Sequence, residues 1–366
     1  MAAKKTIQLT AILVIIIFTL VAYHILQFAK EPPRTNRIFR PPKKRLHQLK
    51  LQDFVVDSGR INAKQERLPN LQNLPWPERE FLKIPMGAPG NSIDQMGGKF
   101  SRAQMRTMLN LLSIFANAME EIGASDRWMI YSGSLIGSFR HHDITPWDDD
   151  LDVLMDLNVR TALWRQILKL RPQICIHSSG LRDKIYAELI EPNNTLQDVD
   201  GSRRLSAHPW GWPYVDIGYY SSNATHIREL ARSYGRTYIY AKTDVFPLLL
   251  RPFYTQWVPA PRNTFAFLQQ SYPDNVHCSS LGYFHPLEIH TKGRTLPCIE
   301  LADRYAFVER VSFDNSLQKL SDSSNDLDWV RERLIRGGEV IHEIDLVAPQ
   351  REGFVDTYVL QMRPQE

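Results

Sequence analysis

Three aspartates at alternate positions constrain this chain more than any other feature. Asp148, Asp150 and Asp152 lie within residues 144–153, which read ITPWDDDLDV. Alternate side chains of a β-strand point to the same face, so the three carboxylates would crowd one edge of a sheet. At about 4 Å, two like charges repel by roughly 4 kcal/mol at an effective dielectric of about 20. The pattern therefore predicts a divalent cation, bound together with a phosphate-bearing substrate.

A Gly-Ser pair upstream and an isolated aspartate downstream extend this pattern. Gly133 and Ser134 precede an apolar stretch that we expect to be a helix, and a helix N-terminus offers backbone N–H groups to a phosphate. Sixteen residues separate Ser134 from Asp150, enough for a helix and a return to a neighbouring strand. Asp216 stands alone in an apolar run, where it is either the third corner of a metal site or a buried, hydrogen-bonded carboxylate.

Apolar periodicity predicts alternating helices and strands between residues 101 and 300. Ser101 and Gln104 have the spacing of a capping box, and the apolar residues that follow recur at helical spacing until Gly123. Further strands are expected at Trp128–Tyr131, Asp150–Met155, Lys184–Ile190 and Trp210–Tyr220, and further helices at Ser134–Phe139, Asn158–Lys169 and Asn263–Gln270. This alternation predicts an α+β domain, built as a mixed sheet flanked by helices.

The N-terminal region predicts a membrane anchor. The 24 residues from Thr6 to Ala29 contain no Lys, Arg, Asp or Glu. As a helix they would reach about 36 Å, enough to cross a hydrocarbon core of about 30 Å with some tilt. A cleaved signal peptide is the alternative, but residues 20–22 form a poor cleavage site. We expect an uncleaved signal anchor, in which residues 1–29 comprise a cytoplasmic tail and a transmembrane helix.

The rest of the chain divides by composition. Residues 30–100 are rich in proline and charge and are expected to be a stem or linker. The catalytic domain is expected at 101–300, and a less regular C-terminal extension packed on it at 301–366. Residues 30–50 hold eight basic side chains against one acidic one, although the whole chain is only +4. The part that follows is therefore net acidic, which argues against a nucleic-acid partner.

The orientation of the anchor is contested within the sequence. The basic segment after it favours a cytoplasmic C-terminal side by the positive-inside rule. Two acceptor sequons, at Asn193 and Asn223, favour a lumenal one.

The three cysteines are sparse and odd in number. We expect a Cys278–Cys298 disulfide with Cys175 free and buried. A zinc site in the stretch 277–298 is the alternative, although no CxxC spacing supports it.

Three blocks of the chain resemble the LicD family, which includes bacterial phosphocholine transferases and, in animals, fukutin and fukutin-related protein. The specific block is residues 131–153, from Tyr131-Ser132-Gly133-Ser134 to the aspartate cluster. The resemblance continues through Trp212–Ile217 and Val258–Tyr272 and covers roughly residues 100–275. It implies the nucleotidyltransferase fold. The cysteine-rich zinc element of fukutin-related protein is not visible, so a ribitol-phosphate substrate is not assumed.

The resemblance also implies roles for individual residues. Asp150 and Asp152 would bind the metal with Asp216 as the third carboxylate, and Gly133 and Ser134 would form the phosphate turn. Other roles are less determined: Asp148 is an acceptor-side group or a turn cap, Arg140 contacts a phosphate or forms a structural ion pair, and His141 and His142 are expected to be polar surface residues.

Members of this family transfer a phospho-alcohol from a CDP-linked donor to a sugar hydroxyl. The resemblance therefore implies Mg²⁺ or Mn²⁺ as cofactor, a CDP-alcohol donor and a glycan or glycoprotein acceptor. It also implies a single-pass type II protein of the Golgi or ER membrane, with the catalytic domain in the lumen. Two alternatives remain: a Golgi glycosyltransferase whose Asp-x-Asp binds a nucleotide sugar, and a non-catalytic glycan-binding or scaffold member.

Overall fold

The computed structural model describes residues 68–88, 94–233, 235–274, 276–280, 282–312 and 327–349. The predicted anchor and most of the predicted stem lie outside these ranges. Within them, no helix is both long enough and apolar enough to span a bilayer.

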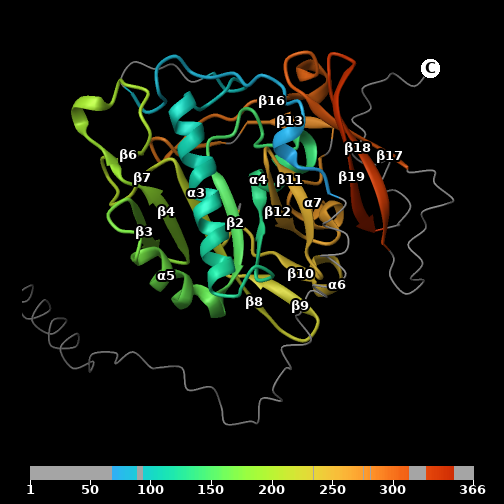
Figure 1. Ribbon diagram of the computed structural model, residues 1–366, viewed down its shortest axis with the longest axis horizontal. Helices are drawn as coiled ribbons and strands as arrows, with labels where there is room; N and C mark the ends of the chain where they lie inside the picture. The colour runs from blue at the N-terminus through green and yellow to red at the C-terminus, as the bar shows by residue number, and fades with distance from the viewer. Residues whose placement is uncertain are drawn as a thin grey trace, which may run out of the picture. The chain divides into compact units, whose positions relative to one another are not determined.

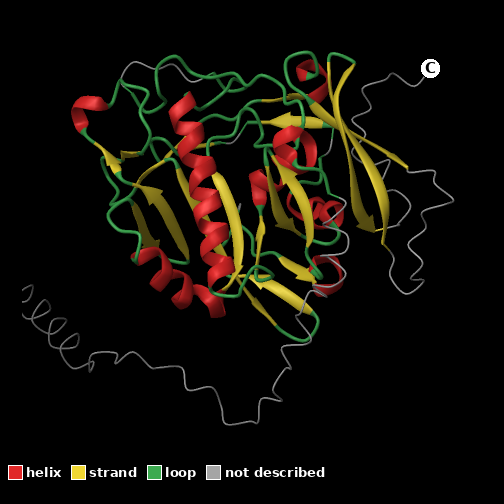
Figure 2. Cartoon of the chain, viewed as in Figure 1, coloured by secondary structure: helices red, strands yellow, loops and turns green. Residues whose placement is uncertain are grey.

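A seven-stranded mixed sheet forms the centre of the domain (Figures 1 and 2). Strands β2 and β8 are parallel, whereas the other neighbouring strands are antiparallel. In spatial order the main strands are β1 (Trp128–Ile130), β2 (Leu151–Asp156), β8 (Tyr214–Ser222), β4 (Arg182–Ala187) and β3 (Ile174–Ser179). Strand β9 (His226–Glu229) pairs with the end of β8, and β10 (Ile239–Ala241) pairs with β9. The parallel pair at the centre brings the starts of β2 and β8 to one edge of the sheet.

Helices flank this sheet. Helices α3 (Arg102–Glu121) and α5 (Arg160–Leu168) contact each other and pack on β3, β4 and β8, and Figure 1 shows α3 crossing the sheet beside β2. Helix α4 (Ser132–His141) contacts β2 and α7 (Thr264–Ser271), and α7 contacts the short α6 (Lys242–Val245). The expectation of an α+β domain with a mixed sheet flanked by helices is confirmed.

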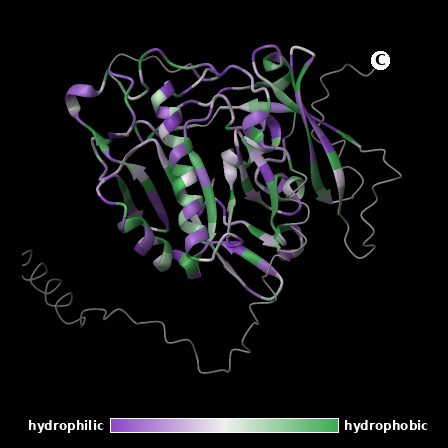
Figure 3. Cartoon of the chain, viewed as in Figure 1, coloured by the Kyte–Doolittle hydropathy of each residue, from purple (hydrophilic) through white to green (hydrophobic). Residues whose placement is uncertain are grey.

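Helix α3 begins as its sequence predicts. The Ser101 side chain accepts the Gln104 backbone N–H, and the Gln104 side chain accepts the Ser101 backbone N–H, so both halves of the capping box are present. Hydrophobic and hydrophilic residues alternate along the helix (Figure 3), and the apolar ones, among them Met108, Leu112 and Phe115, are fully buried. The helix thus contributes one continuous apolar stripe to the main core.

The remaining elements are short and lie around the central sheet. They are β5 (Leu189–Ile190), β6 (Ser202–Arg204), β7 (Gly211–Trp212), β11 (Leu249–Phe253), β12 (Gln256–Ala260), β13 (His277–Ser279), β14 (Tyr283–Phe284), β15 (Ile289–His290), β16 (Thr295–Pro297) and the 3-10 turns η2 (Leu71–Asn73), η3 (Leu157–Val159), η4 (Pro192–Asn194) and η5 (Cys298–Leu301).

The C-terminal part is more regular than its sequence predicts. Strands β17 (Phe307–Ser312), β18 (Leu327–Arg336) and β19 (Glu339–Pro349) form an antiparallel sheet. The inward positions of β18 include Glu332, which is 1% exposed and pairs with Arg251, Arg310 and His142. A charged residue at an inward position breaks the apolar alternation that identifies a strand.

Two boundaries differ from expectation in ways that affect the site. Strand β2 begins at Leu151, so only Asp152 of the three alternate aspartates lies on it. Asp148 lies in a preceding turn, in which its backbone N–H donates to the Thr145 carbonyl. The strand expected at 184–190 begins earlier, at Arg182, and is interrupted at Glu188.

Candidate active site

A row of three charged residues crosses the centre of the sheet. Asp152 on β2 is in register with Asp216 on β8, and Asp216 is in register with Lys184 on β4. Adjacent strands lie about 4.8 Å apart, so these side chains share one face and are near neighbours. The Lys184 Nζ lies 3.3 Å from Asp216 Oδ2. Asp152 and Asp216, two of the three predicted metal-binding carboxylates, are therefore brought together, with the Lys184 ammonium beside them.

Arg182 adds a second cation on the same face. Its NH1 lies 3.6 Å from Asp216 Oδ2 and 3.8 Å from Asp152 Oδ1. Its NH2 donates to Ser233 Oγ at 2.8 Å and lies 3.5 Å from Glu229 Oε1. The guanidinium is thus held between the aspartates and a separate buried carboxylate.

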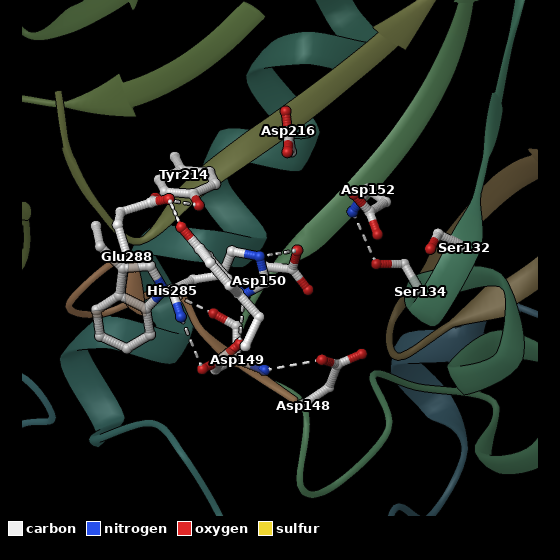
Figure 4. A network of polar contacts seen from close by, with 12 residues as sticks. Ser132, Ser134, Asp148, Asp149, Asp150, Asp152, Tyr214, Asp216, His285 and Glu288 are labelled. Carbon is white, nitrogen blue, oxygen red and sulfur yellow. Dashed lines mark hydrogen bonds and ion pairs between the residues drawn. The ribbon is translucent and has the colours of Figure 1, made fainter. Parts of the chain in front are cut away.

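Asp150 and Asp148 reach the same region from the loop before β2 (Figure 4). Both are buried, at 4% and 5% exposure. The Asp148 carboxylate lies against the first turn of α4, where a Cβ built on Gly133 would fall 2.4 Å from Asp148 Oδ2. A side chain at position 133 would therefore push this carboxylate away from the helix. The loop also packs closely on α4 at Gly137, where a Cβ would fall 2.5 Å from the Asp143 carbonyl. These two contacts fix the loop that carries the acids against the helix.

Ser134 ties the helix to the strand. Its Oγ accepts the Asp152 backbone N–H at 2.9 Å, and the residue is fully buried. The predicted phosphate turn and the predicted metal-binding acid are thus joined by one hydrogen bond.

Burial and mutual repulsion raise the pKa values of three of the aspartates. Burial is the larger cause for Asp148, Asp150 and Asp152, and neighbouring carboxylates add to it. Asp216 behaves differently: although burial alone would raise its pKa, Lys184 and Arg182 hold it below the usual value. Pairing with two cations thus sets Asp216 apart from the other three aspartates.

A hairpin far along the chain completes the site, and sequence reasoning did not identify it. His285 lies between β14 and β15; its Nδ1 is 2.7 Å from Asp149 Oδ1 and its Nε2 is 3.2 Å from Asp150 Oδ2. Its backbone N–H also donates to Asp149 Oδ2. Burial would lower the pKa of His285, but Asp150 and Asp149 raise it to about 10. The imidazole is thus a cation in this arrangement.

The same hairpin brings Glu288 to Lys184. Glu288 accepts hydrogen bonds from the hydroxyls of Tyr214 at 2.6 Å and Tyr283 at 3.0 Å, and from the Trp210 indole N–H at 3.3 Å. Its Oε1 lies 4.0 Å from the Lys184 Nζ. Glu288 adopts a positive φ of 52°, which turns the chain tightly enough to present His285 and Glu288 together.

A disulfide closes the segment that carries this hairpin. Cys278 and Cys298 are bonded, as expected, which rules out their use in a zinc site. Cys175 is free, as expected, but it is half-exposed rather than buried, because it lies on strand β3 at the end of the sheet. The disulfide, together with a bond from the Trp147 indole N–H to the Ser279 carbonyl, holds the hairpin against the acidic loop.

The acidic cluster has unfilled acceptor positions. Among the described residues, Asp150 Oδ1 and Asp216 Oδ1 are buried and have no hydrogen-bond partner. Buried carboxylate oxygens without partners are costly unless a cation joins them. Asp149, Asp150 and His285 also offer ligand atoms that lie within 4.8 Å of one another. The unpartnered carboxylate oxygens fit a divalent cation directly, whereas the second set fits one only once the His285 imidazolium has lost its proton.

Arg140, His141 and His142 do not lie in this cluster. Arg140 is buried, donates to the Asp274 carbonyl at 3.3 Å, and lies 3.8 Å from both sulfurs of the disulfide; its contact with a phosphate stays a prediction. The expectation of surface histidines is wrong, because the C-terminal end of α4 packs against β17. The His141 Nδ1 is 2.7 Å from the Ala306 carbonyl, and His142 pairs with Glu332.

The fold and this cluster place carboxylates at the edge of a mixed sheet, beside the N-terminal turn of a helix. Residues 125–263 match the LicD/FKTN/FKRP nucleotidyltransferase domain. The matched segment contains the aspartate cluster, Lys184 and Asp216, whereas His285 and Glu288 lie beyond its end. No curated protein matches the chain.

Proposed function

We propose that this chain is a metal-dependent phosphotransferase that moves a phospho-alcohol from a CDP-linked donor to a hydroxyl of a glycan. The observation that supports this most directly is the pair of buried, unpartnered oxygens on Asp150 and Asp216, in the same cluster as Asp152, whose backbone N–H donates to Ser134 in the N-terminal turn of α4. A nucleotide diphosphate supplies the anion that such a turn attracts, and it brings its cation to the carboxylates.

Asp150, Asp152 and Asp216 would hold the metal ion. An all-carboxylate set favours Mg²⁺ or Mn²⁺ over softer metals. When bound, the cation would neutralise charge on the diphosphate while the acceptor hydroxyl attacks and CMP leaves. The Asp149–His285 pair adjoins this set and fixes the loop on which Asp150 lies.

The remaining side chains have distinct tasks. Ser134 holds the backbone of Asp152 in place through its Oγ. Asp148, packed on Gly133, is the carboxylate that we assign to the proton of the acceptor hydroxyl, since Asp216 already pairs with two cations.

The test is a donor screen for CMP release. Purified protein is supplied separately with CDP-choline, CDP-ribitol, CDP-glycerol and UDP-sugars, each with Mg²⁺, Mn²⁺ or EDTA. We expect CMP release from one CDP-alcohol, lost in EDTA. Exclusive use of a UDP-sugar would instead establish the glycosyltransferase alternative, and binding of glycan without turnover of any donor would establish the non-catalytic one.

We also propose that the domain lies in the lumen of the Golgi or ER, attached by residues 6–29. Asn193 in η4 and Asn223 after β8 are both exposed, so both sequons are accessible to glycosylation. Endoglycosidase should increase the gel mobility of the expressed protein, and Asn193→Gln with Asn223→Gln should remove that shift. A chain without glycan that is cleaved from the cytoplasmic side of intact microsomes would contradict this topology.

A further inference from the structure

Lys184 occupies an unusual position for a buried lysine. It is 5% exposed and lies in the middle of β4, directly across from Asp216. Its ammonium lies over the Tyr214 ring at 3.7 Å, between the carboxylates of Asp216 at 3.3 Å and Glu288 at 4.0 Å. A flexible four-carbon chain with two anionic partners can shift between them without leaving its pocket.

Arg182 is held more firmly. One side of its guanidinium faces Asp152 and Asp216, and the other side is bound to Ser233 and Glu229. Glu229 is fully buried and also accepts the Tyr131 hydroxyl. Arg182 therefore stays in place when charge near Asp216 changes, whereas Lys184 is held only by its two carboxylate partners and its contacts with aromatic rings.

We propose that Lys184 is a resident counter-ion that competes with the divalent cation for Asp216 and, once displaced, binds the diphosphate of the donor. This rests on the proposed function, because it presumes a cation and a nucleotide diphosphate at the same site. A cation at Asp216 replaces the charge that Lys184 supplies and repels the ammonium. A diphosphate bound to that cation restores an anion for the ammonium to contact.

The arrangement has a thermodynamic consequence. Metal alone must displace Lys184 without giving it a new anion, whereas metal with diphosphate gives it one. Metal and nucleotide should therefore bind with positive coupling, and the coupling should be reciprocal. Removing the lysine charge should strengthen binding of the metal alone and weaken binding of the nucleotide.

The experiment is calorimetric titration of the full chain with Mn²⁺, first alone and then with CDP present. The variants are Lys184→Met, Lys184→Arg and, as a matched control, Lys169→Met, which removes the charge of an exposed lysine at the end of α5. We expect Lys184→Met to bind Mn²⁺ about tenfold more tightly than wild type without nucleotide, and CDP at saturating Mn²⁺ about tenfold less tightly. Lys169→Met should match wild type in both titrations.

Lys184→Arg keeps the positive charge. It therefore tests the proposal even if Lys184→Met does not fold correctly. A guanidinium can bind Asp216 through two hydrogen bonds, so this variant should bind Mn²⁺ more weakly than wild type, opposite in sign to Lys184→Met. Melting curves establish that each variant is folded.

Equal Mn²⁺ affinity in wild type, Lys184→Met and Lys184→Arg would overturn the proposal, as would a wild-type chain that binds no divalent cation. The Lys184→Met substitution should weaken the binding of CMP, which lacks the diphosphate, less than it weakens the binding of CDP. Equal losses of affinity would mean that the displaced ammonium does not bind the diphosphate. The metal titration needs no donor, so the tighter metal binding of Lys184→Met would stand even if no CDP-alcohol were turned over and the proposed function failed.

Discussion

The two faces of the central sheet show how a structural carboxylate differs from one at a reactive site. Asp183 and Lys184 are consecutive on β4 and therefore point to opposite faces. Asp183 is fully buried and accepts hydrogen bonds from Arg160, Trp164 and Tyr219. On the other face, Asp216 is similarly buried but leaves Oδ1 without a partner. Burial alone therefore does not distinguish the two roles; the completeness of the hydrogen bonding does.

The same comparison predicts which face limits stability and which limits catalysis. A saturated buried ion pair is expensive to break, because the remaining charge keeps no partner. A cluster of carboxylates that repel each other destabilises the fold without its cation, so losing one charge there can be stabilising. Stability should therefore depend on the face that carries Asp183 and packs against α5. Catalysis should depend on the opposite face, which carries Asp152, Lys184 and Asp216 and which we call the reactive face.

The largest effect should come from the reactive face. Asp150→Asn or Asp152→Asn should lower kcat/KM by about 10³-fold or more, since each removes a proposed metal-binding carboxylate in a charge-stabilising site. The melting temperature without metal should stay level or rise, because repulsion is relieved.

The matched control is Asp156→Asn, at the far end of β2, which should retain activity. Normal turnover in both Asp150→Asn and Asp152→Asn would remove the basis for the site.

The opposite face should show the reverse pattern. Asp183→Asn should lower the free energy of unfolding by about 3–5 kcal/mol, since Arg160 loses its charged partner at a fully buried carboxylate. Activity per folded molecule should stay within about twofold of wild type. Urea unfolding and an active-fraction assay measure the two quantities, and a stable but inactive Asp183→Asn would erase the distinction between the faces.

The disulfide should affect catalysis as well as stability, because the segment it closes carries His285 and Glu288. Cys278→Ser with Cys298→Ser opens a closed segment of 20 residues and should lower the free energy of unfolding by about 3 kcal/mol. The KM for the donor should rise even at temperatures where the variant is fully folded, as the hairpin loosens. Cys175→Ser is the control and should match wild type; an unchanged KM in the double variant would show that the hairpin holds its place without the disulfide.

Much of the reactive face could be predicted from the sequence, because its signals are local. Asp150 and Asp152 stand two residues apart, and Asp216 is the one acid in an apolar strand. The partners of these acids could not be predicted in the same way. Lys184 and Arg182 look like the polar positions of any strand, and only the register of β4 with β8 places them beside Asp216.

The hairpin residues were missed for a different reason. His285 reaches Asp149 across 136 positions of sequence, and no spacing rule connects them. The C-terminal sheet was missed because Glu332 lies at an inward position of β18 and is neutralised by Arg251 and Arg310 from other strands. In each case tertiary pairing supplied a partner that made a polar residue acceptable inside the fold.

The smallest predicted effect is the pH dependence of stability that comes from His141. Its sign is opposite to that of the aspartates on the reactive face. Burial lowers the pKa of His141 from 6.5 to about 3. The unfolded chain therefore binds a proton that the folded chain does not, so this contribution to stability is full above pH 6.5 and is lost as the pH falls. The loss should approach about 1.4 kcal/mol per pH unit once the pH is well below 6.5.

Asp148, Asp150 and Asp152 have raised pKa values and act with the opposite sign, gaining stability on acidification. Comparing wild type with His141→Gln separates the two effects, since the glutamine amide can still donate to the Ala306 carbonyl but does not titrate. Urea unfolding at about pH 7, 6 and 5 should show the two stability curves converging as the pH falls, by about 0.7 kcal/mol over the first unit and about 1.2 kcal/mol over the second. Parallel curves would mean that His141 is protonated within the fold, and the buried end of α4 would then have to hold a charge.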